Sequence, residues 1–192
     1  MGTVVVTEFV SLDGVMEDPG GAEGYEHGGW TFKFDHGPDG NKFKLDEVLA
    51  ADAQLLGRRT YEGFARAWPS IKDEAGFADK MNSMPKFVVS KTLHAAEWNN
   101  STVLDGDLAE DVAKLKEQFA GDILVAGSAE LVQGLLHHDL IDELRLMVFP
   151  VLLGSGKRLF EDGAALRTFE LVDTKQVGAV AILTLRRAGR VP

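Results

Sequence analysis

The sequence predicts one α/β domain with a mixed, mostly parallel sheet that is flanked by helices and closed by a C-terminal β-hairpin. Short apolar runs at residues 53–57 and 122–126 are each followed by a segment whose apolar residues recur at helical spacing. Such alternation of strands and helices is typical of parallel sheets. Two consecutive segments, 168–176 and 179–187, instead alternate apolar and polar positions around Val177-Gly178, which predicts an antiparallel hairpin. No repeat or linker divides the chain, so we expect residues 1–192 to form a single domain.

The first strand is separated from the first helix by a long loop. A β-branched run at residues 3–9 predicts the strand, and residues 11–14 predict a turn. Residues 19–40 are rich in Gly, Pro and Asp, and they carry the aromatic residues Tyr25, Trp30, Phe32 and Phe34. Large aromatics left in water forgo apolar burial of roughly 1.5–3 kcal/mol each. We therefore expect this loop to pack over the substrate side of a cleft or against a second subunit.

The remaining elements follow from hydrophobic spacing. Helices are predicted at residues 42–49, 60–68, 77–84, 108–118 and 128–138, and strands at residues 53–57, 86–90, 122–126 and 143–153. Gly154-Ser155-Gly156 predicts a turn. Thr60 and Ser128 stand where they can cap the helices that they begin, and Glu130 adds a favourable negative charge to a first turn.

Composition and charge exclude several classes of protein. The net charge of −10 repels phosphate backbones, so nucleic acid is not expected as a partner. The absence of cysteine removes disulfides, thiol nucleophiles and thiolate metal sites. No apolar stretch approaches the ~20 residues that span a bilayer, and the N-terminus does not resemble a signal peptide. We expect a cytoplasmic protein that does not bind membranes.

No metal site is expected in this sequence. His137 and His138 are adjacent, so they project from different faces of a helix. The acidic residues between positions 105 and 111 lack the spacing and the glycine of a calcium-binding loop.

The most informative motif is Leu55-Leu56-Gly57-Arg58-Arg59-Thr60-Tyr61-Glu62. It places two arginines between a strand that ends in glycine and a helix that begins at Thr60. Helix N-termini expose unpaired N–H groups, and guanidinium groups make bidentate contacts to phosphate. The motif therefore indicates a phosphate site. The alternative is a plain helix cap at Thr60 with two solvated arginines.

Two further strand ends carry groups that suit phosphate. In residues 123–131 a strand is followed by Gly127, where a ligand can approach the backbone closely, and then by a helix. The segment lacks the G-x-G-x-x-G spacing of a Rossmann fingerprint, and an ordinary strand–helix turn is its alternative interpretation. Ser90-Lys91-Thr92 ends another strand with hydroxyls and a cation. Because ligands gather at the carboxyl ends of strands, the three segments together predict one site.

The ordered set of motifs resembles the dihydrofolate reductase superfamily, and within it the reductase domain of riboflavin biosynthesis and its stand-alone bacterial relatives. Val10-Ser11-Leu12-Asp13-Gly14 is similar to the SLDG turn of this branch, and Gly57-Arg58-Arg59-Thr60 to its GRxT element. Ser90-Lys91-Thr92 resembles the segment beside the adenosine 2′-phosphate, and Gly127-Ser128 the turn over the pyrophosphate. Residues 142–156 resemble the DEL…P…LGxG tail. The resemblance covers nearly the whole chain and implies a dihydrofolate-reductase-like fold.

The resemblance also implies an NADPH-dependent reductase that acts on a small pteridine or ribityl-pyrimidine-like substrate. The protein would orient the cofactor, which carries the hydride chemistry. The nicotinamide would lie near Val10 and Met16. The implied cofactor-binding residues are Val10, Met16, Gly57, Arg58, Arg59, Thr60, Ser90, Lys91, Thr92, Gly127, Ser128, Ala129, Glu130 and Leu131. The implied substrate-binding residues are Asp13, Tyr25, Trp30 and Pro150.

One position departs from dihydrofolate reductase, which places a carboxylate near the start of its first helix. Here the matching residue is Asn41, with Asp39 and Asp46 nearby, so dihydrofolate reductase activity itself is not expected and no catalytic residue is assigned. A non-catalytic nucleotide- or ligand-binding protein on the same fold is therefore the alternative function. A homodimer is one assembly open to the chain, since twofold dimers are the commonest oligomers.

Overall fold

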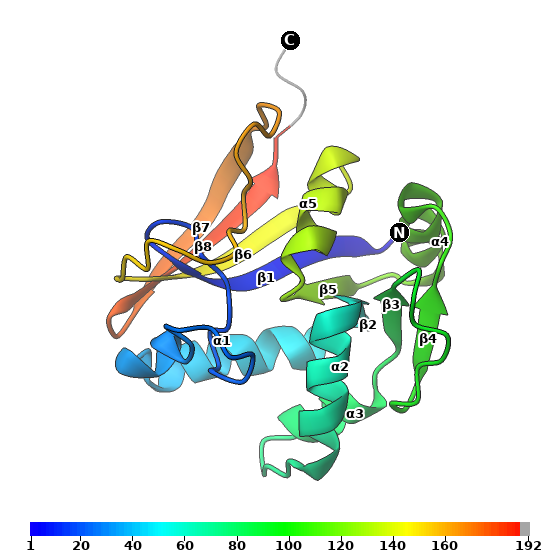
Figure 1. The fold of residues 1–192 in the computed structure, drawn as a ribbon, viewed down its shortest axis with the longest axis horizontal. Helices are drawn as coiled ribbons and strands as arrows, with labels where there is room; N and C mark the ends of the chain where they lie inside the picture. The colour runs from blue at the N-terminus through cyan, green and yellow to red at the C-terminus, as the bar shows by residue number, and fades with distance from the viewer. Residues whose placement is uncertain (189–192) are drawn as a thin grey trace.

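The computed structural model describes residues 1–188, whose strands form one eight-stranded sheet with helices on both faces (Figure 1). The sheet order is β4-β3-β2-β5-β1-β6-β8-β7. Neighbouring strands are parallel from β4 to β6, and β8 pairs antiparallel with both β6 and β7. This confirms the predicted mixed sheet with its terminal hairpin. The strands are β1 (Thr3–Ser11), β2 (Ala53–Gly57), β3 (Lys86–Val89), β4 (Ser101–Leu104), β5 (Asp122–Ala126), β6 (Glu143–Phe149), β7 (Phe169–Val177) and β8 (Val180–Arg187).

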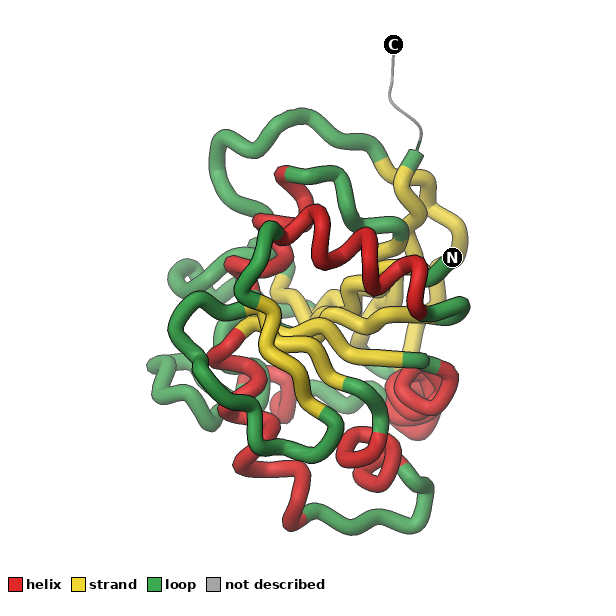
Figure 2. The backbone as a smooth tube through the Cα atoms, turned by 90° about the vertical axis from the view of Figure 1, so that its right-hand side faces the viewer, coloured by secondary structure: helices red, strands yellow, loops and turns green. Residues whose placement is uncertain are grey.

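The helices divide between the two faces of the sheet, as the edge-on view in Figure 2 shows. One face carries α1 (Gly37–Ala50), α2 (Arg58–Ala67) and α3 (Phe77–Ser83), and the other carries α4 (Leu108–Gln118) and α5 (Ala129–His137). Side chains of a strand alternate between faces. Accordingly Val5 packs with α1–α3, whereas Val4 and Val6 pack with α4 and α5. Among the described residues, no helix has both the length and the apolar character needed to cross a membrane.

The central strands β1 and β5 send their connections to opposite faces of the sheet. From β1 the chain passes through α1 to β2, which lies beyond β5; from β5 it passes through α5 to β6, which lies beyond β1. The two strands pair only as far as Thr7 and Ala126. Open α/β sheets bind ligands at such a switch point, at the carboxyl ends of the strands. We call the place where the ends of β1 and β5 separate the switch-point crevice.

Several boundaries differ from the sequence predictions for identifiable reasons. Helix α1 begins at Gly37 rather than near residue 42, because Pro38 is well suited to a first turn. Helix α2 begins at Arg58, so Thr60 lies inside its first turn and is not its cap. Strand β6 ends at Phe149 instead of residue 153, since Pro150 has no N–H to donate to a ladder. Strand β4 was not predicted.

The terminal hairpin packs against the loop that precedes α1. The amide of Ala179 donates a hydrogen bond of 3.0 Å to the carbonyl oxygen of Asp35. Gly178 has a φ of 57°, and a Cβ there would clash with the same oxygen. Glycine is therefore required at this turn. Trp30, Phe149, Val177, Val180 and Ile182 form a small core between the loop and the hairpin.

Candidate functional site

The first turns of α2 and α5 meet at the carboxyl ends of β2 and β5. No side-chain hydrogen bond caps either helix at its N-terminus. Helix N-termini carry partial positive charge and unpaired N–H groups, so two of them at one place favour an anion. The predicted strand ends at Gly57 and Gly127 are thus neighbours in the fold, which their separation in the sequence does not reveal.

The hydroxyl group of Ser128 joins the two turns. Its oxygen accepts a hydrogen bond of 2.8 Å from the amide of Gly57 and donates one of 2.9 Å to Oγ1 of Thr60. Ser128 has a left-handed backbone with a φ of 66° and does not cap α5, contrary to the sequence prediction. Its side chain instead crosses to the other turn.

The glycines of this site permit the close approach of the two turns. Gly127 has a φ of 63°, and a Cβ there would lie 2.8 Å from Oγ1 of Thr60. A Cβ at Gly57 would lie 3.0 Å from the side chain of Ser128. The room that Gly127 leaves is therefore filled by Thr60, and the glycine is needed for packing between the turns.

Cationic side chains lie beside these turns. Arg58 and Arg59 are exposed, and Arg58 pairs with Glu62 at 3.1 Å one helical turn away. Such a solvated pair contributes little stability, so the guanidinium group can exchange its partner at small cost. In the first turn of α5, Glu130 is exposed, and its carboxylate lies 3.6 Å from the ammonium group of Lys157.

The end of β3 lies next to the end of β2, since Gly57 pairs with Val89 in the parallel register. Ser90 therefore follows directly beside Arg58. The hydroxyl oxygen of Ser90 accepts hydrogen bonds from the amides of Thr92 and Leu93, at 3.2 and 3.0 Å. The ammonium group of Lys91 donates to the carbonyl oxygens of Asp105 and Gly106. Neither acceptor of Lys91 is charged, so its positive charge is not neutralised by these bonds.

The SLDG turn is tied to the LGSG turn by Asp13. Its carboxylate accepts hydrogen bonds from the hydroxyl of Ser11 at 2.6 Å and from the amides of Leu153 and Gly154 at 3.1 and 2.7 Å. These bonds, that from Ser11 first, lower the pKa of Asp13 to about 2. Asp13 thus holds together two segments that lie far apart in the sequence.

The aromatic loop lines a pocket of about 610 Å³ at the carboxyl end of β1. Phe9 of β1 and Phe149 of β6 contribute to its wall, and Phe32 and Phe34 come from the loop. Lys33, Asp35 and His36 add polar groups. The loop therefore faces a hollow beside β1, on the side of the sheet that carries α1.

Trp30 does not line this pocket. Its indole is 0% exposed, packs edge-on against Phe149 at 5.3 Å and donates a hydrogen bond of 2.9 Å to the carbonyl oxygen of Glu17. Because the indole has no exposed surface, this position contradicts the expectation that Trp30 binds the substrate. Tyr25 lies elsewhere in the loop and donates to the carbonyl oxygen of Ser155 at 2.8 Å, and Pro150 is exposed.

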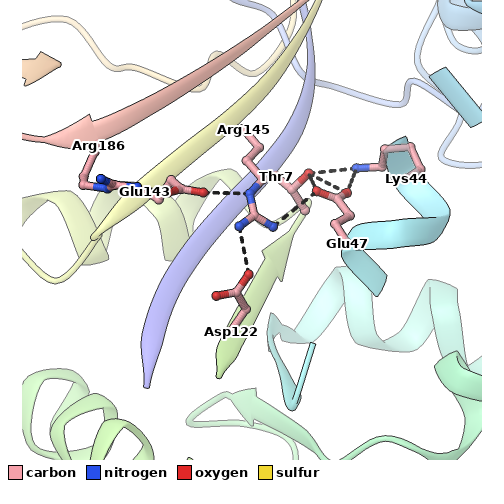
Figure 3. Close-up of polar contacts among 7 residues, drawn as sticks. All are labelled: Thr7, Lys44, Glu47, Asp122, Glu143, Arg145 and Arg186. Carbon is pink, nitrogen blue, oxygen red and sulfur yellow. Dashed lines mark hydrogen bonds and ion pairs between the residues drawn. The ribbon is translucent and has the colours of Figure 1, made fainter. Parts of the chain in front are cut away.

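A polar network anchors α1 to the sheet beneath this pocket (Figure 3). The hydroxyl of Thr7 donates to Glu47 at 2.8 Å and accepts from the ammonium of Lys44 at 2.8 Å, and Lys44 lies 2.5 Å from Glu47. Arg145 lies 2.8 Å from both Asp122 and Glu143. The network fixes α1 against β1, β5 and β6.

Glu8 is a buried acid of β1 that the sequence motifs did not indicate. It is 6% exposed on β1, and its Oε1 atom has no hydrogen-bond partner. Burial raises the pKa of this carboxyl well above its usual value, against the lowering effects of the Lys44 charge and of the nearby Gly127 backbone. The available signal was a single carboxylate inside an otherwise apolar strand.

The remaining predicted cofactor residues form an apolar wall beside the crevice. Val10, Met16, Ala129 and Leu131 are buried in one cluster with Val6. Uncapped helix N-termini, arginines at their edge and an apolar wall are the groups that a dinucleotide with charged phosphates and a nicotinamide ring requires. The residues present therefore fit this class of cofactor.

The sheet order and the antiparallel C-terminal hairpin define an α/β domain of the dihydrofolate-reductase-like class. A family model described as the RibD C-terminal domain matches residues 2–183. Two uncharacterized proteins of Bacillus subtilis (strain 168) are also similar: YyaP, 31% identical over 90% of this chain and 87% of its own, and YwjB, 30% identical over 93% and 94%. The chain belongs to the RibD C-terminal domain family.

Solved structures share the fold. A putative riboflavin biosynthesis protein from Shewanella sp. PV-4 superposes with a TM-score of 0.75 at 22% identity, over 97% of this chain and 99% of that one. RibD of Acinetobacter baumannii gives 0.66 at 18% identity, over 98% and 59%. A diaminohydroxyphosphoribosylaminopyrimidine deaminase/5-amino-6-(5-phosphoribosylamino)uracil reductase from Thermotoga maritima gives 0.62 at 15% identity, over 97% and 56%. The chain thus spans little more than half of the last two proteins.

Proposed function

We propose that the chain is an NADPH-dependent reductase of a small heterocycle of the pteridine or ribityl-pyrimidine type. The observation that carries the proposal is the meeting of the uncapped first turns of α2 and α5 at the carboxyl ends of β2 and β5, where Ser128 joins them. A nucleotide diphosphate is the ligand class that such a pair of turns suits. The Thermotoga maritima neighbour is named as a reductase of a pyrimidine, which supports the substrate class.

In this proposal the protein binds the phosphate groups of the cofactor at the carboxyl ends of β2, β5 and β3. Arg58, Arg59 and Thr60 would hold phosphates at the start of α2, and residues 127–131 would do so at the start of α5. Ser90, Lys91 and Thr92, which lie beside Arg58 through the pairing of β2 and β3, would hold the 2′-phosphate. Since the protein carries a net charge of −10, a local cationic set is what an anionic cofactor requires.

The reactive end of the cofactor would lie against the apolar wall. When bound, NADPH supplies a hydride to an electron-poor carbon of the substrate. Val10 and Met16 would orient the nicotinamide ring and exclude water from it. Val10 belongs to β1, and Met16 follows the SLDG turn. Asp13 binds this turn to the LGSG turn through the amides of Leu153 and Gly154.

The substrate would occupy the aromatic pocket. Phe9 of β1 and Phe149 of β6 line this pocket, which lies at the same end of β1 as the apolar wall. Aromatic walls suit a planar heterocycle, and Lys33 and Asp35 offer polar contacts. Asp13, Tyr25 and Pro150 remain proposed substrate residues at the neighbouring turns.

A non-catalytic binding protein is the second candidate, and one observation favours it. The first turns of α1 present no acid to the pocket: Asn41 is exposed, and Asp39 and Asp46 pair with Lys175 and Lys42 at 3.8 and 2.5 Å. A domain that has kept its cofactor site without an acid in the first turns of α1 would bind the cofactor and not turn over.

Turnover separates the two candidates. Purified protein would be titrated with NADPH, and NADPH oxidation would then be followed with a panel of oxidised pteridines and ribityl-pyrimidines. Saturable binding with steady oxidation supports the reductase. Binding without oxidation of NADPH by any member of the panel supports the binding protein, and the absence of binding contradicts both.

A further inference from the structure

The feature from which this inference starts is the imidazole of His36, in the aromatic pocket where the substrate is proposed to bind. His36 and Phe149 both line this pocket, and their rings meet edge to face with the centres 6.4 Å apart. His36 is partly exposed, whereas its Nδ1 atom is buried and has no hydrogen-bond partner within residues 1–188. A buried polar atom without a partner costs stability, so its presence calls for a functional explanation.

Helix α1 leaves a space for this ring at Gly40. A Cβ on Gly40 would lie 2.7 Å from Nδ1 and 2.9 Å from the Cβ of His36. Gly40 lies inside α1 and has no positive φ, so its backbone conformation does not require glycine. Glycine inside a helix is less stable than alanine, because it loses more conformational freedom on folding. The glycine therefore serves to seat the imidazole.

The position of Nδ1 indicates which ring nitrogen carries the proton. His36 immediately precedes α1, and its side chain makes no capping hydrogen bond. The N-terminus of a helix carries partial positive charge, which favours a lone pair over an N–H on a nitrogen packed against it. In a neutral imidazole one nitrogen is a donor and the other an acceptor. A lone pair on Nδ1 therefore places the N–H on Nε2, at the end of the ring farther from the backbone.

The other polar side chains of the pocket are engaged or exposed. The hydroxyl of Thr31 donates to a backbone carbonyl of the loop at 2.7 Å, and the carboxylate of Asp35 accepts from a backbone amide at 2.7 Å. Lys33 is exposed, and its flexible side chain makes no hydrogen bond or ion pair within the described part of the chain. Among these four side chains, His36 alone combines a seated ring with an unused hydrogen-bonding edge.

We propose that His36 determines substrate specificity by donating a hydrogen bond from Nε2 to a ring carbonyl of the heterocycle. The proposal rests on the proposed function and narrows the substrate to oxo-substituted pteridines or pyrimidines. Phe9 and Phe149 suit the faces of a planar ring but do not distinguish its substituents. A site built to bond one group of a ligand rejects an analogue that lacks this group, because the polar atom of the site is then left unpaired. His36 thus selects the carbonyl and orients the ring.

The first test reads the ring nitrogens directly and does not depend on turnover. Protein with ¹⁵N-labelled histidine is studied by NMR, and the His36 signals are assigned by their loss in His36→Leu. We expect the N–H on Nε2 in the ligand-free protein. Saturation with lumazine, a pteridine with ring carbonyls, should shift the Nε2 signal and leave the exposed His138 unchanged. A proton on Nδ1, or His36 signals that do not move when lumazine binds, overturns the proposal.

The second test separates recognition from a structural role. The affinities for lumazine and for 2,4-diaminopteridine, in which amino groups replace the ring carbonyls, are compared by fluorescence quenching. The wild type should prefer lumazine, and His36→Leu should lower this preference about tenfold while NADPH affinity stays within about twofold. His36→Gln, whose amide N–H replaces the Nε2 donor, should recover part of the preference. An equal loss for both pteridines in His36→Leu, or a wild type without preference, contradicts the proposal.

Gly40→Ala tests the seat of the ring while His36 itself is unchanged. The new methyl group would lie 2.7 Å from Nδ1, so the ring must move and lumazine affinity should fall as in His36→Leu. The double variant should lose no more than His36→Leu alone, because both changes act on one hydrogen bond. Gly63→Ala, with open space around its Cβ in α2, is the matched control. Unchanged lumazine affinity in Gly40→Ala would show that this space does not hold the ring, and the proposal fails.

The kinetic outcomes keep the two proposals apart. If the wild type reduces a pteridine and His36→Leu raises its KM about tenfold with kcat nearly unchanged, both proposals are supported. If KM and kcat are both unchanged in His36→Leu, His36 does not select the substrate and the reductase assignment stands. If the wild type binds NADPH but no pteridine or ribityl-pyrimidine, the proposed function fails in its substrate class, and the His36 proposal with it.

Discussion

The hydroxyl of Ser128 donates a 2.9 Å hydrogen bond to Oγ1 of Thr60 and thereby joins the first turn of α5 to the first turn of α2. The two residues belong to motifs 68 positions apart in the sequence. Because the helices lie on opposite faces of the sheet, this bond closes the end of the crevice from both sides. Through its second hydrogen bond, from the amide of Gly57, Ser128 also holds the end of β2 in the proposed site.

Replacement of Ser128 by alanine should loosen the crevice. The change removes the acceptor of the Gly57 amide and the donor to Thr60, each bond contributing about 0.5–1.5 kcal/mol. We expect unfolding free energy to fall by about 1–3 kcal/mol and NADPH affinity to fall about 10-fold. Urea unfolding and calorimetric titration measure these effects. Ser70→Ala, at an exposed hydroxyl bonded only to its own turn, is the control; equal effects of both variants would remove Ser128 from the site.

Gly127→Ala should be costly although alanine is small. Its φ of 63° is unfavourable for a residue with a Cβ, and the new atom would lie 2.8 Å from Oγ1 of Thr60. We expect a loss of at least about 1–2 kcal/mol of stability, together with loss of NADPH binding. Gly63→Ala, in the middle of α2 with open space around its Cβ, should instead stabilise the protein by roughly 0.5–1 kcal/mol. A normally stable Gly127→Ala that still binds NADPH would contradict the packing argument.

Two aromatic residues of one loop should respond differently to truncation. Trp30→Ala removes a fully buried indole, so we expect a loss of about 3–5 kcal/mol in unfolding free energy. Phe32 is 79% exposed and lines the pocket, so Phe32→Ala should leave stability nearly unchanged and raise the KM of the substrate. Thermal melts and steady-state kinetics distinguish these outcomes. A Phe32→Ala variant with unaltered KM would exclude the pocket as the substrate site.

Lys86 gives the fold a predictable response to alkaline pH. It is 0% exposed, its ammonium lies 4.3 Å from the ring centre of Trp98, and burial lowers its pKa from 10.5 to about 8. Between these two values the unfolded chain binds more protons than the folded chain, so this residue's contribution to stability rises with pH. The stability of the wild type relative to Lys86→Met should therefore increase from about pH 8 to about pH 10.5. Denaturant unfolding at several pH values measures this, and a constant difference would show that the lysine pKa is not shifted.

The sequence predicted strongly patterned elements well. The bounds of β2, α4 and β5 agree with the structure, because each is a run of apolar or amphipathic residues bounded by glycine, an acidic cap or a polar turn. Strand β4 escaped prediction since Ser101–Leu104 has four residues at the sheet edge and none is fully buried. Its pairing with β3, and not its own pattern, makes it a strand.

The composition of the site was harder to predict than its motifs. Local pattern identified Gly57 and Gly127, but only the sheet order places them together. Trp30 was expected at the ligand because aromatic loops often face ligands, whereas here its apolar surface is buried against Phe149. Glu8 was hidden in a strand predicted from its β-branched residues, since the effect of a buried carboxyl depends on neighbours from α1 and the Gly127 turn.

The most direct test of the account is a calorimetric titration of the wild-type protein with NADPH and, separately, with NADH. We predict saturable binding of NADPH and at least ~10-fold weaker binding of NADH, because a charged hydrogen bond to the 2′-phosphate contributes about 1.5–3 kcal/mol. The residues responsible would be Arg58, Arg59, Ser90 and Lys91. Equal affinity for the two dinucleotides would contradict the assignment of these residues, and the absence of binding by either would contradict the cofactor site itself.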